Sequence, residues 1–319
     1  MPTFALGRER PHEAITAHCF AIPAVPVYDP GGIVERAAVC RSVAMFKVQH
    51  RKRSMNRWLC DLAEEAGRIA LDFLRDGFET KTKPDGSLVT SADLRLDQFI
   101  QERIRARYPK DCVLSEESPD EPDRLNARRV WLVDPIDGTT HYASRRPDFG
   151  VLITRCEDGG AVECVAHFPA LWVTLYASAD AGAFVNGRPV KVSDHDFEGA
   201  RIVCTVDGAS ALNTAPAAQR NNAMAIFRVV TGEIDACALQ TSPSAGEHDY
   251  AWASCAAAAA GGMFTDLGGA TLKYNKTRRS MPRVLVCSNG VIHERLLREL
   301  ADAIDGSSCV QEGPRRTGA

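Results

Sequence analysis

The sequence of 319 residues lacks the cysteine patterns that mark disulfide-rich proteins and zinc sites. It contains no Cys-x-x-Cys pair, and its eleven cysteines, an odd number, are scattered between Cys19 and Cys309. This pattern argues against a disulfide framework and against a zinc cluster. It favours reduced thiols in a cytoplasmic protein.

Long apolar runs and a strong charge of one sign are also missing. The longest apolar run, at 251–263, is too short and too rich in small residues to cross a bilayer. The N-terminus has acids and prolines where a signal peptide has its apolar segment. The net charge of -3 gives no reason to expect nucleic acid, and the basic run at 50–54 is short and free of aromatic residues. We therefore expect no membrane partner and no nucleic-acid partner.

The organisation of the chain changes along its length. Hydrophobic residues make up 45% of the chain and charged residues 25%, which is ordinary for a soluble globular protein, and the length suggests about two domains or one large one. We predict an N-terminal extension at 1–54, poorly packed and rich in proline, and a tail at 306–319. Between them we expect an N-terminal α+β lobe at 55–193 and a C-terminal α/β lobe at 194–305.

Hydrophobic periodicity predicts the elements of these lobes. We expect two amphipathic helices at 55–77 and 91–108, with a turn-rich loop between them at 81–90. Strand-like segments follow, and from 149 to 193 they have the turns of an antiparallel sheet. These segments lie at 112–118, 130–134, 149–157, 161–169, 171–178 and 182–193. Alternating strands and helices then follow, at 201–206, 220–233, 234–239, 250–262, 282–289 and 292–304.

The segment VWLVDPIDGTT, at 130–140, has an unusual end for a buried strand. Pro135 stops the strand at Asp134, and Asp137 can then turn back to the same point in space. Gly138 permits a tight backbone path, and the two threonines after it suit a helix N-terminus, which favours an anion. Mg²⁺ would let both carboxylates stay charged. An Asp-Pro turn before an Asx-capped helix accounts for the same residues without any ligand.

Acids at other element ends strengthen the metal hypothesis. Glu116 and Glu117 follow a strand, where solvated acids are common. Asp93 lies in the first turn of a helix, where the helix dipole alone accounts for it. Asp249 precedes a helix rich in small residues and suits an N-cap. Four such positions in one chain suggest a shared metal site.

The motifs together resemble the inositol monophosphatase superfamily of Mg²⁺-dependent, lithium-sensitive phosphatases. The resemblance rests on DPIDGTT at 134–140, SEES at 115–118, VTSAD at 89–93 and HDYAWASCAAAAAGG at 248–262, which occur in the family's order. It covers about 55–300 and leaves out the N-terminal extension. It implies a layered α/β/α/β/α sandwich of the α/β (α+β) class, with the active site between the lobes.

The resemblance also implies which residues hold the metal, two or three Mg²⁺ ions in all. One ion would be held by Glu116, Asp134 and the carbonyl of Ile136. A second would be held by Asp134, Asp137 and Asp249.

Catalytic and phosphate-binding roles follow from the same resemblance. Glu116 and Thr139 would orient the attacking water, and Asp93 would complete this network or contact a third ion. The backbone N–H groups of Gly138 and Thr139, together with Thr140, would bind phosphate.

Glu117 is either a ligand or an orienting group. Lys83 is either a contact to the phosphate or metal loop or a solvated lysine.

The substrate side departs from the family pattern. His141 stands where the family commonly has Asn, and His248 stands where it commonly has Trp. The segment RNNAMA, with Asn221, replaces the family's sugar-contacting turn, so we place Asn221 and His248 on the substrate wall. An acid for a ring hydroxyl is not obvious, since the segment at 239–249 offers Gln240, Ser242 and Glu247. Four arginines could serve a doubly charged ligand or lie on the surface: Arg145, Arg146, Arg278 and Arg279.

We therefore expect a Mg²⁺-dependent phosphomonoesterase that acts on a small soluble phosphorylated metabolite of the inositol monophosphate type. The alternatives are a 3'-phosphoadenosine 5'-phosphate phosphatase, a histidinol-phosphate phosphatase and a non-catalytic relative that binds metal or phosphate. The resemblance implies a homodimer.

Overall fold

The computed structural model describes residues 54–215 and 221–310, with side chains described up to residue 305. The expected extension at 1–54 therefore lies almost wholly outside the described residues, as do Arg220 and the end of the expected tail. Helix α6 (His293–Val310) continues past residue 305, where we expected the tail to begin.

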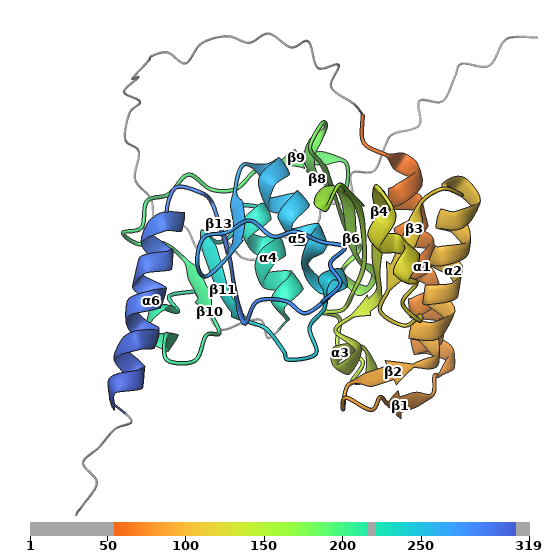
Figure 1. Ribbon diagram of the computed structural model, residues 1–319, viewed down its shortest axis with the longest axis horizontal. Helices are drawn as coiled ribbons and strands as arrows, with labels where there is room; N and C mark the ends of the chain where they lie inside the picture. Colours follow the sequence, from red (N-terminus) through yellow and green to blue (C-terminus); the bar gives the residue numbers. More distant parts are fainter. Residues whose placement is uncertain (1–53, 216–220, 311–319) are drawn as a thin grey trace, which may run out of the picture. The chain divides into compact units, whose positions relative to one another are not determined.

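The described residues form five alternating layers (Figure 1). Helices α1 (Arg57–Asp76) and α2 (Ser91–Arg107) cover one face of a seven-stranded sheet. Helices α4 (Asn222–Val230) and α5 (Glu247–Ala260) separate this sheet from a four-stranded sheet, and α6 covers the far side of the smaller sheet. The expected α/β/α/β/α sandwich is confirmed.

The larger sheet has the strand order β3-β4-β5-β6-β7-β8-β9. Its strands are β3 (Cys112–Ser115), β4 (Arg129–Asp137), β5 (Gly150–Glu157), β6 (Gly160–Phe168), β7 (Val173–Ser178), β8 (Gly182–Val185) and β9 (Arg188–Val190). All neighbours pair antiparallel except β3 and β4, which are parallel.

The smaller sheet has the order β10-β11-β13-β12. Its strands are β10 (Ile202–Cys204), β11 (Ala236–Gln240), β12 (Met263–Asp266) and β13 (Val284–Ser288). The larger sheet lies within 55–193 and the smaller within 194–305, but one hydrophobic cluster contains residues of both, including Cys164 and Leu285. The division into two lobes stays a prediction.

Several local predictions were wrong. The loop expected at 81–90 is mostly a hairpin of β1 (Thr80–Thr82) and β2 (Leu88–Thr90). The single strand expected at 182–193 is the hairpin β8–β9, which turns at Asn186 and Gly187, both with positive φ. Strand β12 was missed because four residues directly after a helix carry no clear period.

Strand β4 does not stop at Asp134, as the sequence suggested. It continues to Asp137 through an irregularity in which Asp134 pairs with Leu152 and Asp137 pairs with Gly150. Three steps along β4 thus oppose two steps along β5, which is the count of a β-bulge. Pro135 fits there because a bulge leaves a residue without a ladder partner.

The alanine run of the sequence is explained by the position of α5. This helix packs against strands of both sheets and is buried on nearly all sides. Small side chains at Ala253, Ala256 and Ala257 allow this close approach, and Trp252 fills the space beside them. No helix in the described part of the chain is long and apolar enough to span a membrane.

Gly67 allows α1 to lie close to the larger sheet. A Cβ atom at this position would lie 2.5 Å from the ring of His167 and 2.8 Å from Pro169. The His167 ring is buried, and its Nδ1 lies 3.0 Å from the Thr174 hydroxyl, so the ring has no free space to move into. The glycine is therefore required by packing, not by its backbone angles.

We predict that Gly67→Ala destabilises the protein. The overpacking cost of about 1–3 kcal/mol exceeds the gain of about 1 kcal/mol in helix propensity. Thermal unfolding of the variant should show a lower Tm than wild type. The control is Gly160→Ala, where the new Cβ would lie 3.6 Å from the nearest atom, the Glu157 carbonyl oxygen. An unchanged or raised Tm for Gly67→Ala would contradict this account.

Candidate metal centre

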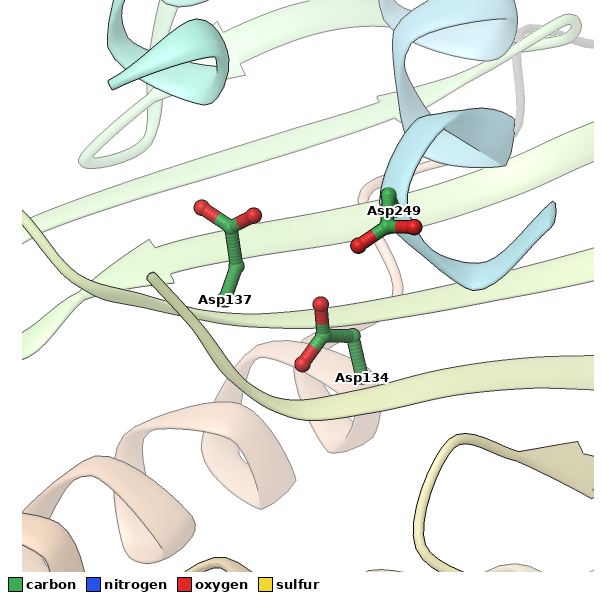
Figure 2. A group of neighbouring side chains, drawn as sticks. All are labelled: Asp134, Asp137 and Asp249. Carbon is green, nitrogen blue, oxygen red and sulfur yellow. The ribbon is translucent and has the colours of Figure 1, made fainter. Parts of the chain in front are cut away.

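Three carboxylates from two elements lie together at one point (Figure 2). Asp134 and Asp137 belong to β4, and Asp249 lies in the first turn of α5. Each offers an oxygen within 4.8 Å of the oxygens of the other two. Asp134 is 1% exposed, and the other two are partly buried.

The bulge in β4 explains why two acids three residues apart can share a site. In a regular strand, residues i and i+3 point to opposite faces of the sheet. The extra residue between Asp134 and Asp137 removes this alternation and allows both side chains to point toward the same place. The two aspartates of the D-x-x-D motif can therefore share one site only because of the bulge.

Asp249 is held by its own helix. Its Oδ2 accepts a 2.6 Å hydrogen bond from the backbone N–H of Gly246, the residue that caps α5. The positive end of the helix dipole favours a carboxylate here. The N-cap interpretation of Asp249 is thus correct in part, because this residue caps the helix and also faces the cluster.

Glu116 reaches the cluster through the parallel pairing of β3 and β4. Ser115 is opposite Val133, so the residues that follow them, Glu116 and Asp134, are neighbours at the end of β3. The N–H of Glu116 donates to the carbonyl of Val133 at 3.1 Å. The negative charge of Glu116 helps to raise the pKa of Asp134.

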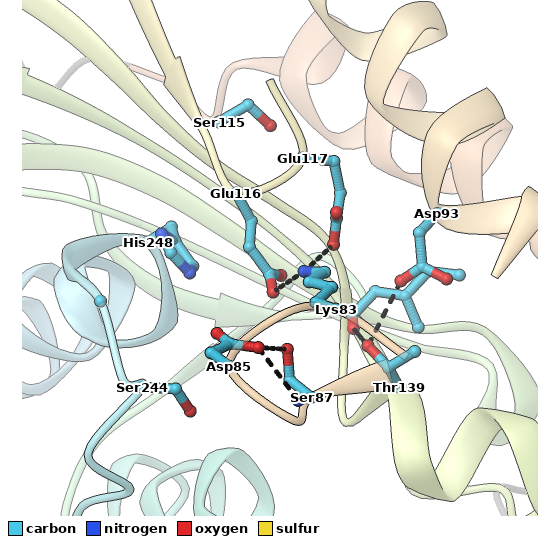
Figure 3. Close-up of polar contacts among 12 residues, drawn as sticks. Lys83, Asp85, Ser87, Asp93, Ser115, Glu116, Glu117, Thr139, Ser244 and His248 are labelled. Atoms are coloured by element: carbon cyan, nitrogen blue, oxygen red, sulfur yellow. Dashed lines mark hydrogen bonds and ion pairs between the residues drawn. The ribbon is translucent and has the colours of Figure 1, made fainter. Parts of the chain in front are cut away.

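Lys83, directly after the hairpin strand β1, is not a solvated lysine. Its Nζ lies 2.8 Å from Glu116 Oε1 and 2.6 Å from Glu117 Oε1 (Figure 3), and 19% of its side chain is exposed. Burial and the neighbouring Glu116 raise the pKa of Glu117 to about 7. Glu117 forms an ion pair with Lys83 and is not one of the three clustered acids.

The cluster is electrostatically strained without a cation. Burial, followed by the charge of Asp249, raises the pKa of Asp137 to about 7. Burial and neighbouring carboxylates raise the pKa of Asp134 well above its usual range, and burial raises that of Asp249. Oδ1 of Asp134 is buried without a hydrogen-bond partner among the described residues. Oxygen donors alone, with no thiolate or imidazole in the group, fit a hard cation such as Mg²⁺.

Thr139 and Asp93 form a second group beside the cluster. The Thr139 hydroxyl lies 3.3 Å from Asp93 Oδ1 and 3.1 Å from the carbonyl oxygen of Ile136. Asp93 also accepts from the N–H of Thr90 at 2.8 Å, which completes the N-cap of α2. Burial raises the pKa of Asp93. The helix-dipole interpretation of Asp93 therefore holds, and the same carboxylate also contacts Thr139.

Gly138 begins the short helix α3 (Thr139–Ala143) with φ of 80°. A Cβ here would be strained and would lie 2.9 Å from the side-chain nitrogen of Asn221. That amide donates to the carbonyl of Asp148 at 2.8 Å and lies 3.3 Å from Asp137 Oδ2. Asn221 therefore also steadies the acid cluster, a contact the sequence did not indicate.

A cavity of about 820 Å³ opens over these groups. Most of the predicted site residues line it: Glu116, Asp137, Gly138, Thr139, Thr140, Asn221, His248 and Asp249. Asp93, Asp134 and Ile136 are buried beneath the lining. The structure thus brings the predicted metal and catalytic residues together.

The wall of the cavity differs in part from the sequence expectation. Glu247 is fully buried, and its oxygens accept from the N–H groups of Asn275 and Lys276, so it is not available for a ring hydroxyl. Gln240 and Ser242 line the cavity.

Of the four arginines, only Arg279 lines the cavity among the described residues. Arg146 binds Asp148, and Arg145 binds the carbonyl of Leu74. His141 also lines the cavity, with its Nδ1 3.0 Å from Asp148 Oδ2. No role was predicted for Asp148, because no motif surrounds it.

Comparisons with known proteins show which family and fold the chain resembles. The model of the Inositol monophosphatase family matches residues 52–305. The 3'(2'),5'-bisphosphate nucleotidase CysQ of Aggregatibacter actinomycetemcomitans is 30% identical over 231 residues, which are 68% of this chain and 86% of that protein. Histidinol-phosphatase of Chlorobaculum parvum is 39% identical over 134 residues, which are 42% of this chain and only 51% of that protein. An IMPase structure from Thermotoga maritima superposes with a TM-score of 0.66 at 23% identity, covering 78% of this chain and 98% of that one.

We predict that the acid cluster makes the metal-free protein less stable as pH rises. A raised pKa means that folded Asp137 keeps a proton which the unfolded chain releases near its ordinary pKa of about 3.9. Stability from this group is therefore lost between about pH 4 and pH 7. Mg²⁺ should relieve the repulsion, so the rise in Tm on adding Mg²⁺ should be larger at about pH 8 than at about pH 5.

The control is Asp134→Asn, which removes one charge and one metal ligand. Its Mg²⁺-induced rise in Tm should be much smaller at both pH values, while the titration of distant groups is unchanged. An equal Mg²⁺ effect in wild type and variant would show that the ion binds elsewhere.

Proposed function

The chain belongs to the inositol monophosphatase family, and from this premise we propose that it is a Mg²⁺-dependent phosphomonoesterase acting on a small soluble phosphate ester. One observation carries the proposal: the three oxygens of Asp134, Asp137 and Asp249 that lie within 4.8 Å of one another. Buried acids in this arrangement fit a divalent cation next to an open cavity better than any purely structural role.

We assign the metal ligands as the sequence suggested. Glu116, Asp134 and the carbonyl of Ile136 would hold one Mg²⁺, and Asp134, Asp137 and Asp249 would hold a second. When bound, Mg²⁺ neutralises the phosphate and lowers the pKa of a coordinated water. Asp93, which is near Thr139, is the candidate for contact with a third ion.

The residues of the chain itself orient the reactants. The Thr139 hydroxyl lies between two acceptors, Asp93 Oδ1 and the carbonyl oxygen of Ile136, so its single proton points toward them and its lone pairs can accept from a water in the cavity. Glu116 is the second group for that water. The first N–H groups of α3 have no partner within the helix, so those near Gly138 and Thr139 are suited to phosphate oxygens, with Thr140 at the exposed edge.

The substrate wall does not offer Glu247 to a ring hydroxyl, because this acid is committed to Asn275 and Lys276. Outside the metal centre the wall has one acid among the described lining residues, Asp85, and its Oδ1 accepts from the N–H and hydroxyl of Ser87. A second candidate is 3'-phosphoadenosine 5'-phosphate, because Arg279 lines the same cavity and suits the second phosphate of such a ligand. The similarity of this chain to the bisphosphate nucleotidase CysQ supports this candidate.

Other expectations stay open to experiment. A histidinol-phosphate phosphatase would use His141 and His248 on the wall, and a non-catalytic relative would bind Mg²⁺ or phosphate without turnover. The cytoplasmic location and the homodimer stay predictions.

We predict Mg²⁺-dependent release of phosphate from at least one member of a defined panel. The panel contains inositol 1-phosphate, 3'-phosphoadenosine 5'-phosphate, histidinol phosphate and fructose 1,6-bisphosphate, each assayed with Mg²⁺ and with EDTA. Asp134→Asn should lower kcat/KM by more than about 100-fold, since even outer-shell partners of metals cost about 10- to 100-fold. Binding of Mg²⁺ without turnover of any ester would favour the non-catalytic relative.

We also predict that the Thr139 hydroxyl acts in the chemical step. Thr139→Val keeps the shape of the side chain and removes the hydroxyl, so kcat should fall by about 10²- to 10⁴-fold, the range for a positioned proton-transfer group. Thr139→Ser keeps the hydroxyl and should retain most of the activity. Stabilisation by Mg²⁺, measured as the rise in Tm, should persist in both variants. Full activity in Thr139→Val would remove this residue from the mechanism.

A further inference from the structure

Glu116 lies in a short turn whose two ends are both bound to one side chain outside the turn. The turn is Ser115 to Ser118, at the end of β3. The Ser115 hydroxyl donates to Asp97 Oδ1, and the Ser118 hydroxyl donates to Asp97 Oδ2 at 2.5 Å. Asp97 thus uses its two oxygens to hold the residues on either side of Glu116 and Glu117.

Gln101 completes this arrangement from the next turn of α2. Its Nε2 lies 2.9 and 3.0 Å from the two oxygens of Asp97 and 2.6 Å from the Ser118 hydroxyl. Asp97 is 5% exposed, and its hydrogen bonds come from two hydroxyl groups and one amide. Since the lone pairs of a buried carboxylate need donors, Asp97 and the turn hold each other in position.

We propose that Asp97 is a positioning residue that sets the place of Glu116 in the metal centre. This inference rests on the proposed function, in which Glu116 is a metal ligand and orients the attacking water. Apart from the turn, the contacts that fix Glu116 are its N–H bond to Val133 and its ion pair with Lys83. The backbone bond leaves the side chain free to rotate, and Lys83 belongs to a two-stranded hairpin outside both large sheets.

The position of Asp97 on α2 gives this helix a double role. Asp93 and Asp97 are four residues apart, so they lie on the same face of the helix. Asp93 contacts Thr139, after β4, while Asp97 holds the turn after β3. One rigid helix therefore aligns both groups that orient the water, Thr139 and Glu116.

The test compares Asp97→Asn with a matched control. The amide keeps the size of the side chain, but its NH₂ group would face donors from Ser118 or Gln101, so the turn loses a fixed end. We expect the Mg²⁺ concentration that gives half-maximal activity to rise, or kcat to fall, by about 10- to 100-fold, as for other residues that orient metal ligands. Mg²⁺ affinity is measured by calorimetry on the full chain, in addition to kcat on the best ester of the panel.

The control is Asp111→Asn, at the opposite end of β3. Asp111 is also a buried carboxylate, and it holds Trp131 Nε1 at 3.0 Å and Arg129 Nε at 2.9 Å. The Asp111→Asn substitution should lower the Tm of the protein without changing its Mg²⁺ affinity. Ser118→Ala is the milder variant if Asp97→Asn does not fold. The effects of the two substitutions should be less than additive in the double variant, because each removes the same hydrogen bond between Ser118 and Asp97.

The outcomes separate this inference from the proposed function. If wild type binds Mg²⁺ but hydrolyses nothing, the proposed function fails, and the affinities of the variants still decide the role of Asp97. If Asp97→Asn and Ser118→Ala lower the Tm but leave Mg²⁺ affinity and kcat at wild-type values, Asp97 is only structural and the inference is overturned. The inference is also overturned if wild type binds no Mg²⁺, because Glu116 is then not a metal ligand.

Discussion

Repulsion between carboxylates at one buried point is the constraint on which this site depends. Two unit charges 4 Å apart repel by about 1 kcal/mol in water and by about 4 kcal/mol at the effective dielectric constant near a protein surface. Asp134, Asp137 and Asp249 have oxygens within 4.8 Å of one another, so their repulsion is of this order, and the charge of Glu116 adds to it. A cation that binds them would replace several unfavourable interactions with favourable ones, so the affinity that we propose for a hard divalent ion would follow from the fold itself.

A few local structural features bring these acids together. A single parallel pair, β3 with β4, in a sheet that is otherwise antiparallel places Glu116 next to Asp134. A bulge in β4 adds Asp137, and the first turn of the buried helix α5 adds Asp249. Since Asp134, Asp137 and Asp249 lie on a strand and a helix and not on a long loop, the repulsion between them cannot be relieved by moving the side chains far apart.

The sequence indicated that acids would gather at one point because they lie near the ends of elements that have a clear hydrophobic pattern, and their roles as metal ligands stay a prediction. Prediction failed where geometry depends on partners distant in the chain. Nothing local distinguishes the bulge at Pro135 from a strand end, and the ion pair of Lys83 with Glu116 and Glu117 joins segments more than thirty residues apart. The role of Glu247 was equally hidden, since its partners Asn275 and Lys276 lie on another loop.

The two sides of the cavity differ in how they are built, and this difference bears on specificity. The metal side rests on β4, α2 and α5, whose positions are set by the hydrophobic core. The substrate side consists largely of residues between elements, such as Thr241, Ser244 and Arg279. Loop residues can change without loss of the core, so one metal centre can serve several phosphate esters. The position of the acids is thus constrained by packing, whereas we propose that the choice of ester depends on a few wall residues, His141 and His248 among them.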